Sequence, residues 1–525
     1  MPYPAFAGYR AHYDAAYRRI TDRPSQPVVH SQETNSSFEA VEITALRSGW
    51  TNSALTSEAV SFVLPARKKK PTLWPVPSEP DRNPALSSVL KADGVHSSGL
   101  RNSYKWWVVL MLWWICFFNY ADRQAIYAVF PKLQQEFGFT KLQLGLIGSA
   151  FMWVYAAAAP VAGLIVDRFR RKDLILGGCL FWSAITVMTG WCSKLYQFVI
   201  VRAAEGLGET FYFPASMSLT SDYHGQSTRS RALSLHQSSV YAGTVIGSWL
   251  GAWFAERHGW RIGFYFFGAS GMILALLLYR FLQEPRRGAA DQQTFESPNA
   301  ASQAPEFNPT RLPFAKPSIW LLMAGFVCAN FVATIFLTWT PTFLVEKFGF
   351  KLTQAGLSGS LFIHLASFLS VPMGGIAADR FSRRWPGGRI FVQAGGLIIG
   401  SAFIVLVGHT RDVPTLIAAM TCFGLCKGVY DSNIFAAMYD FVEPRLRGTM
   451  AGLMNAVGWG GGALGPLFVG WSAMYGGRAT EVENMSAAIG WCGLIYLAGA
   501  ALLLFAAIRF APHDRLGWMP GNAPN

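Results

Sequence analysis

Apolar segments long enough to cross a lipid bilayer recur about a dozen times between Lys105 and Phe510. Each holds about 20 residues, the length that a helix needs to cross a hydrocarbon core about 30 Å thick. Hydrophobic residues make up 52% of the chain and charged residues only 14%, against about 25% charged in a typical soluble domain. A large soluble protein with long buried helices would need far more charge between them. The sequence therefore predicts an all-α integral membrane protein.

The apolar segments fall into two groups separated by a polar stretch. We predict twelve transmembrane helices at 105–132, 141–165, 173–192, 195–219, 232–254, 261–281, 317–341, 352–376, 388–408, 412–437, 449–474 and 485–510. The expected organisation is a cytoplasmic tail (1–103), a first six-helix half (104–282), a cytoplasmic linker (283–316), a second six-helix half (317–511) and a cytoplasmic tail (512–525). The first tail is rich in Ser, Pro, Ala and charge without a periodic pattern, so it is predicted to be disordered.

A short motif occurs twice and pairs the two halves. Residues 163–172 read GLIVDRFRRK, and residues 375–384 read GIAADRFSRR. Each copy joins one apolar segment to the next, at the same place in each half. A repeated unit of this kind indicates a duplication, with two pseudo-symmetric halves. We call the two copies the first and second elbow.

Basic residues gather in the short loops that follow the even-numbered helices. They are Arg168, Arg170, Arg171, Lys172, Arg229, Arg231, Arg380, Arg383, Arg384, Arg389, Arg445 and Arg447. Because cytoplasmic loops carry an excess of Lys and Arg, both termini are predicted to be cytoplasmic. The net charge of +14 is therefore explained by membrane topology, and we expect no nucleic-acid partner. The seven cysteines lie mostly within apolar segments, which argues against a disulfide framework or a metal site.

The two elbows resemble the signature of the major facilitator superfamily. The segment Arg202-Ala203-Ala204-Glu205-Gly206-Leu207-Gly208 is similar to a second motif of that family. Arg170 and Ser382 stand where the family usually has Gly, whereas the Asp-Arg core and the closing basic pair are present. The resemblance covers residues 105–510 and implies a twelve-helix transporter that works by alternating access, with its substrate held between the halves near the middle of the membrane.

Within that superfamily, one group of residues resembles the anion:cation symporters that carry hexuronates, galactonate and related sugar acids. These residues are Asn119-Tyr120-Ala121-Asp122-Arg123 on the first helix and Arg202 and Glu209 on the fourth. The resemblance implies proton coupling by Asp122 and Glu209 and anion binding by Arg123 and Arg202. The stretch Ser230-Arg231-Ala232-Leu233-Ser234 is similar to Spinster-type transporters of lipids and lysolipids, so the substrate class stays open.

Four charged residues on two predicted membrane helices call for a function, because each costs about 2.5–3.5 kcal/mol on insertion scales. Arg202 and Glu209 are two turns apart, hence on one face of their helix. We hypothesise that each Arg is held by Asp122 or Glu209 in the empty carrier, and that protonation of the carboxylate frees the Arg for a carboxylate substrate. The alternative is a permanent ion-pair network that only packs the first half.

The second half offers further candidates for contact with the substrate. Lys427 is expected to be a second anion contact, although Lys427 and Asp431 are an i, i+4 pair and could instead neutralise each other. The residues predicted to bind substrate are Tyr120, Arg123, Arg202, Tyr212, Lys427, Tyr430 and Asn433. Weaker candidates are His236, Gln237, Asn330, Trp339, His364, Asn455 and Trp459.

The elbows are predicted to take part in gating rather than in substrate binding. Their acidic and basic side chains can form weak pairs that break in each transport cycle. The residues assigned to gating are Gly163, Asp167, Arg168, Arg171, Gly375, Asp379, Arg380 and Arg383. The alternative is that the Arg residues only fix the orientation of the chain in the membrane.

The predicted function is proton-coupled symport of a small organic anion such as a sugar acid. We expect a monomer in the plasma membrane (the inner membrane of a bacterium), driven by the proton gradient without a cofactor or metal. An enzyme is not expected, because the sequence shows no nucleotide-binding loop, metal-spaced cluster or nucleophile-base set. Two alternatives are a carrier of lysolipid or another amphiphile, and a membrane sensor that binds without transport.

Overall fold

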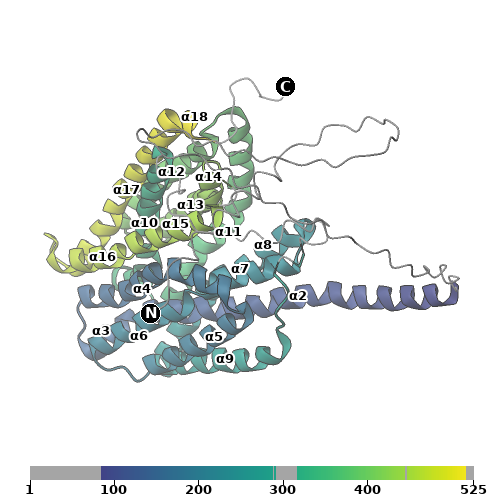
Figure 1. Ribbon diagram of the computed structural model, residues 1–525. Coiled ribbons are helices and arrows are strands. Elements are labelled where there is room, and N and C mark those ends of the chain that lie inside the picture. Colours follow the sequence, from purple (N-terminus) through teal and green to yellow (C-terminus); the bar gives the residue numbers. More distant parts are fainter. Residues whose placement is uncertain (1–83, 288, 291–315, 444–445, 516–525) are drawn as a thin grey trace, which may run out of the picture. The chain divides into compact units, whose positions relative to one another are not determined.

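The computed structural model describes residues 84–287, 289–290, 316–443 and 446–515, with side chains from Ser103 onward except that of Gln226. The described residues form helices joined by short turns and contain no β-strand. The predicted all-α class is therefore confirmed (Figure 1). Most of the predicted tail and linker, and residues 516–525, lie outside the described residues. Residues 84–103, which the sequence assigns to the tail, belong to the first helix of the structure.

The helices of the first half follow the predicted order. They are α2 (Pro84–Ala128), α3 (Phe130–Phe137), α4 (Lys141–Arg168), α5 (Arg171–Thr189), α6 (Leu195–Glu209), α7 (Tyr212–Tyr223), α8 (Gln226–Arg257) and α9 (Trp260–Phe281). α4 begins with a capping box, in which the Thr140 side chain accepts a hydrogen bond from the Gln143 amide and the Gln143 side chain accepts one from the Thr140 amide. Such reciprocal bonds satisfy two backbone donors and fix where the helix begins.

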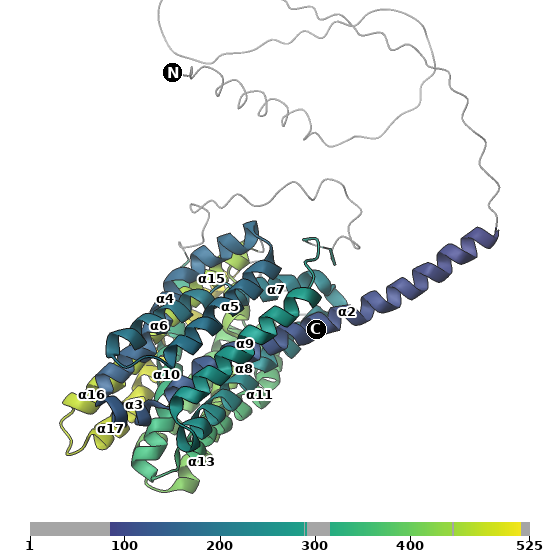
Figure 2. The ribbon, with the colours of Figure 1, turned by 90° about the horizontal axis from the view of Figure 1, so that it is seen from below.

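The second half packs against the first (Figure 2). Its helices are α10 (Pro317–Phe348), α11 (Leu352–Arg384), α12 (Gly388–His409), α13 (Val413–Asp431), α14 (Ile434–Tyr439), α15 (Arg447–Gly462), α16 (Leu464–Tyr475) and α17 (Glu481–Phe505), followed by a π-helical turn (Ala506–Phe510) and α18 (Ala511–Asp514). Eight helical stretches of the described residues are long and apolar enough to cross a membrane. The other predicted spans correspond to α2, to α6 with α7, to α8, and to α15 with α16, which carry charged, polar or glycine-rich sequence.

Two details of the backbone repeat between the halves. Gly138 and Gly349, which end α3 and α10, both have φ of 67°, a left-handed conformation that favours glycine. The fourth predicted span breaks directly after Glu209, between α6 and α7, and the tenth breaks directly after Asp431, between α13 and α14. Interruptions of membrane helices occur beside the substrate and ion sites of transporters, and here each is a short local irregularity in which Thr210 and Ser432 keep right-handed helical angles. Both breaks therefore point to the region around Glu209 and Asp431.

The two halves pack closely at the end of the bundle opposite the elbows, which we call the far end. The Gln124 side chain on α2 donates to the carbonyl of Leu337 on α10 at 2.8 Å. The Ser149 hydroxyl on α4 donates to the carbonyl of Ala463 at 2.5 Å. A Cβ on Gly145 would come within 2.6 Å of the Pro466 carbonyl oxygen. The halves thus approach backbone to backbone at the far end, as small residues allow.

An ion pair between the halves lies at the same end. Lys141 at the start of α4 pairs with Glu346 near the end of α10, and the Lys141 ammonium also donates to the Gln134 side chain at 2.7 Å. Lys141 is buried. A buried ammonium requires a partner, since leaving it unpaired costs several kcal/mol. We call the Lys141–Glu346 pair the far-end latch, because it joins the first half to the second.

The far-end latch predicts a non-additive effect of mutation on stability. Lys141→Met or Glu346→Leu alone leaves one charge without its partner and is expected to lower the free energy of unfolding by about 1 to 3 kcal/mol. The double variant removes both charges and is expected to recover much of that loss. Apparent melting temperatures of the four proteins in detergent micelles measure the coupling. Additive losses would contradict an energetic link between Lys141 and Glu346.

Candidate functional site

The centre of the first half holds a buried ion pair between α2 and α6. Arg123 binds the carboxylate of Glu209 with two nitrogens, and its Nε lies 3.0 Å from Glu209 Oε2. The same guanidinium donates to Asn119 Oδ1 at 3.3 Å, one turn earlier on α2. Both nitrogens, Nε and Nη2, donate to Oε2, and Glu209 Oε1 is buried without a hydrogen-bond partner among the described residues. The pairing that the sequence hypothesis assigns to the empty carrier is therefore present for Arg123.

The second arginine has a partner that the sequence analysis does not name. Arg202 pairs with Glu205, three residues later on α6, rather than with Asp122 or Glu209. Residues three apart on a helix are neighbours on its surface, so this pairing could have been inferred from the spacing in the second motif. The Nε and Nη2 atoms of Arg202 are buried without a hydrogen-bond partner among the described residues.

Asp122 completes a cluster of three carboxylates. Its Oδ2 accepts from the Thr186 hydroxyl of α5 at 3.1 Å, and its Oδ1 accepts from the Arg123 amide at 2.7 Å. One oxygen from each of Asp122, Glu205 and Glu209 lies within 4.8 Å of the others. These acids and the two arginines are at most 3% exposed. Three carboxylates against two guanidiniums leave one negative charge in excess, so neutrality needs one proton or another cation.

Aromatic rings surround the Arg123 guanidinium. Its central carbon lies 4.4 Å from the ring centre of Phe151, 4.5 Å from Tyr120, 5.6 Å from Tyr155 and 5.8 Å from Trp459. Cations are attracted to the faces of such rings. Trp459 lies on α15 of the second half and also contacts Tyr155, with ring centres 5.7 Å apart. Arg123 therefore lies where the two halves meet.

A cavity between the halves reaches this position. Its larger part measures about 510 Å³ and extends toward the elbow end, where Tyr439 and Ala451 line it. Its smaller part measures about 210 Å³ and is lined by Tyr120 and Arg123. Both parts share Gln237, Tyr241, Asn330, Ala333, Lys427, Asp431 and Trp459. The larger part alone is within the range of small-molecule sites, about 300 to 1,000 Å³, and the smaller part adds to it.

The residues predicted to bind substrate fall into two groups, those that line the cavity and those that do not. Tyr120, Arg123, Lys427 and Tyr430 line it. Arg202, Tyr212 and Asn433 are buried and are not among its lining residues. The Tyr212 hydroxyl donates to the Leu112 carbonyl at 2.7 Å and lies 2.8 Å from His236 Nε2. Asn433 Nδ2 donates to the Gly374 carbonyl at 3.2 Å. These groups connect helices within their own halves.

The weaker candidates divide in the same way. Gln237, Asn330, His364, Asn455 and Trp459 line the cavity. His236 and Trp339 are buried. The Trp339 ring nitrogen donates to the Pro466 carbonyl at 3.0 Å, which is a packing contact within the second half. Lys427 and Asp431 form the predicted ion pair along α13.

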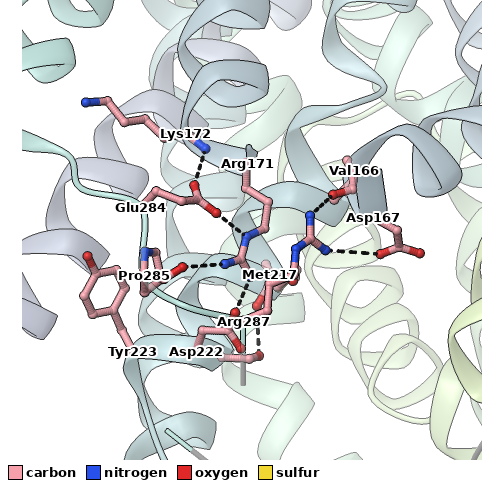
Figure 3. Close-up of polar contacts among 12 residues, drawn as sticks. Val166, Asp167, Arg171, Lys172, Met217, Asp222, Tyr223, Glu284, Pro285 and Arg287 are labelled. Atoms are coloured by element: carbon pink, nitrogen blue, oxygen red, sulfur yellow. Dashed lines mark hydrogen bonds and ion pairs between the residues drawn. The ribbon is translucent and has the colours of Figure 1, made fainter. Parts of the chain in front are cut away.

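Arg171 of the first elbow is locked inside its own half (Figure 3). Its guanidinium pairs with Asp222 at the end of α7 and with Glu284 after α9, the latter at 2.9 Å, and donates to the Ser218 hydroxyl at 3.0 Å. The arginine is fully buried. Arg287 beside it donates to the Val166 carbonyl at 2.7 Å and lies 3.9 Å from Asp167. These contacts join the elbow to the end of α7 and to the segment after α9.

The second elbow forms an equivalent network with other residues. Arg389 pairs with Asp379 at 2.6 Å and with Asp440 at 3.3 Å, and Arg515 lies 3.9 Å from Asp440. The remaining gating candidates are at the surface: Asp167, Arg168, Asp379, Arg380 and Arg383 are exposed, and a Cβ on Gly163 or Gly375 would meet nothing within 4 Å. Each of these ion pairs lies within the half of its own elbow, so the role of the elbows in gating stays a prediction.

Known proteins with the same architecture were found by profile and by structure. The profile of the Major Facilitator Superfamily matches residues 112–466. A crystal structure of a bacterial homologue of the human lysosomal transporter Spinster superposes with a TM-score of 0.70 at 22% identity and covers 79% of this chain and 99% of that one. At this identity the likeness concerns the fold.

Relatives by sequence are transporters from plants and bacteria. A "Probable anion transporter 4, chloroplastic" of Oryza sativa subsp. japonica is 29% identical over 382 residues, which are 70% of this chain and 64% of that protein, a little under two thirds of its length. A "Probable galactarate/D-glucarate transporter" of Escherichia coli (strain K12) is 24% identical over 71% of this chain and 87% of its own length. A "D-galactonate transporter" of Escherichia coli O6:H1 is 26% identical over 72% of this chain and 92% of its own length.

Neighbouring arginines of the first elbow provide a matched test of its structural role. Arg171→Met removes a buried cation from two carboxylates and is expected to cost about 3 to 5 kcal/mol of folding free energy. Arg170, whose side chain is 66% exposed and 3.7 Å from Asp173, forms a surface pair worth about 0 to 1 kcal/mol. Thermal unfolding in micelles should therefore show a clearly lower melting temperature for Arg171→Met than for wild-type protein. The melting temperature of Arg170→Met should stay close to the wild-type value. Equal melting temperatures would show that Arg171 is not structural.

Proposed function

Because this chain belongs to the major facilitator superfamily, we propose that it is a secondary transporter that moves a small organic anion together with a proton. It is a multi-pass membrane protein and not an enzyme, as its transporter relatives indicate. The observation that carries the proposal is the buried cluster of three carboxylates and two guanidiniums around Arg123 and Glu209. Its excess negative charge gives a proton a place to bind, and its arginine gives an anion a partner.

The exchange works by competition for one guanidinium. In the state described here Glu209 occupies Arg123. A proton on Glu209, or one shared within the cluster, removes the negative charge that holds Arg123, so a substrate carboxylate can take its place. A buried charge without a partner is costly. Arg123 is therefore expected to be paired at all times, either with the Glu209 carboxylate or with the substrate. Proton and anion therefore enter together.

Asp122 and Glu205 tune the cluster without touching the substrate. Both are buried and neither is among the cavity-lining residues. Glu205 neutralises Arg202, and Asp122 supplies the third carboxylate, whose proximity raises the cost of keeping all three ionised. Asp122 is therefore assigned to proton coupling with Glu209, as the sequence analysis predicts.

Alternating access fits the contacts at the two ends of the bundle. The far end is joined by the far-end latch and by backbone approach, while the cavity extends toward the elbow end. With the basic loops in the cytoplasm, the elbow end and both termini are cytoplasmic, and the cavity faces inward. We place the protein in a plasma membrane as a monomer of two six-helix halves joined by the 283–316 linker.

A small anion fits the cavity better than an amphiphile. A carrier of lysolipid would need an aromatic-lined opening toward the lipid. Aromatic side chains such as Tyr241, Tyr430 and Trp459 do line the central cavity, but they share it with the amides of Gln237, Asn330 and Asn455. The charged residues lining the central cavity instead offer two cations, Arg123 and Lys427.

Uptake by purified protein in liposomes tests the proposal. Hexuronates, aldonates, aldarates and a lysolipid are supplied in turn, with an inward pH gradient, an inward sodium gradient or no gradient. The proposal predicts concentrative uptake of at least one sugar acid with the pH gradient alone. Uptake of the lysolipid only, or sugar-acid uptake that follows the sodium gradient and ignores pH, would contradict it.

Glu209→Gln separates coupling from binding in the same assay. The amide cannot ionise, so Arg123 loses its competing charge and proton-driven accumulation is expected to fall by about tenfold or more, as for the loss of a charged interaction. Exchange of labelled for unlabelled substrate needs no net proton movement and is expected to continue. Accumulation at the wild-type level with full pH dependence would remove Glu209 from the coupling step.

A further inference from the structure

Two cations line the central cavity from opposite halves, and each is paired with a carboxylate. Arg123 with Glu209 belongs to α2 and α6 of the first half, and Lys427 with Asp431 belongs to α13 of the second half. Arg123, Lys427 and Asp431 all line the smaller part of the cavity. Among the described residues that line the two parts of the cavity, these three are the Arg, Lys, Asp and Glu residues, and His364 is the histidine.

The second pair is open to a solute in a way that a packing ion pair is not. The Lys427 and Asp431 side chains are 19% and 25% exposed, whereas those of Arg123 and Glu209 are 4% and 0% exposed. An ammonium carries three donors and can hold Asp431 with one while it offers another to a ligand. Lys427 can therefore bind an acid group without first losing its internal partner.

We propose that the substrate is a hydroxylated dianion with an acid group at each end, one bound by Arg123 and the other by Lys427. This inference rests on the proposed function and specifies its substrate class. A monoanion would satisfy Arg123 alone and leave Lys427 with Asp431, so the second half would contribute no charge-assisted contact. Charge-assisted bonds are the strong ones, so the geometry favours a two-headed acid.

The residues between the two cations fit a hydroxylated chain. Gln237, Asn330 and Asn455 line the cavity, and amide groups both donate to and accept from hydroxyls. The Asn330 Nδ2 is buried without a hydrogen-bond partner among the described residues. A buried donor of this kind is costly unless a ligand or water satisfies it. Asn330 therefore marks a position for a substrate hydroxyl.

Galactarate and D-galactonate form a matched pair of probes, because they differ only in one end group, carboxylate against hydroxymethyl. Binding of each to purified protein in micelles is measured by calorimetry. Wild-type protein is expected to bind galactarate about 10- to 100-fold more tightly, the effect of one charge-assisted bond. Equal affinities, or tighter binding of D-galactonate, would overturn the proposal.

Variants of the second pair show which residue reads the second acid group. Lys427→Gln should remove the preference by weakening galactarate binding while D-galactonate binding stays near the wild-type value. Lys427→Arg keeps the charge and should retain the preference, which controls for folding. Asp431→Asn removes a negative charge beside Lys427, which repels an incoming acid group, and should strengthen galactarate binding more than D-galactonate binding. Equal weakening of both acids by Lys427→Gln, with normal unfolding, would show that Lys427 only neutralises Asp431.

Failure of the underlying function gives a different result. If neither acid binds to well-folded wild-type protein, the proposed transport of sugar acids fails and the substrate class with it. If D-galactonate binds as tightly as galactarate and is taken up with protons to the same extent, the transport function stands and only the two-headed substrate is wrong. The two outcomes are read from the same wild-type titrations and the same liposomes.

Discussion

The buried pair between Arg123 and Glu209 is the interaction on which the rest of the site depends. Each charge is almost completely removed from solvent, and neither is affordable there without the other. A carrier must nevertheless let an anion reach Arg123, so the pair has to be replaceable. The other features of the site bear on this exchange. The third carboxylate gives the cluster an excess negative charge, the aromatic rings surround the Arg123 guanidinium, and the cavity lets an anion reach it.

The duplication distributes this chemistry unequally between similar halves. Both halves break a membrane helix next to an acidic residue, Glu209 in the first and Asp431 in the second. The first half surrounds its acid with two more carboxylates and two buried arginines, whereas Asp431 pairs with Lys427 on the same helix. A common backbone plan therefore supports a deep, charge-rich site in one half and an exposed ion pair in the other.

The sequence predicted the architecture well and the pairing of side chains less well. Apolar length and the repeated elbow were sufficient for the helices, because both signals are local and periodic. The hypothesis that Asp122 or Glu209 holds each arginine agrees with the structure for Arg123 but not for Arg202. Its partner Glu205 was not named, although their spacing on α6 indicates it. The far-end latch of Lys141 and Glu346 could not be predicted, since it depends on how separate helices pack. The same reason explains why Tyr212 and Asn433, which are polar residues on membrane helices, are buried within their halves instead of facing the cavity.

Direct measurement of protons tests the central claim, that a substrate anion and the Glu209 carboxylate compete for Arg123, so that the anion and a proton bind together. Purified protein in weakly buffered micelles is mixed with a sugar acid that it binds, and the pH change is followed with an indicator dye. The account predicts that binding draws a proton from solution, and that the Glu209→Gln protein binds the same acid with no such uptake. Binding by wild-type protein without any proton uptake, over the whole range from mildly acidic to mildly basic pH, would contradict it.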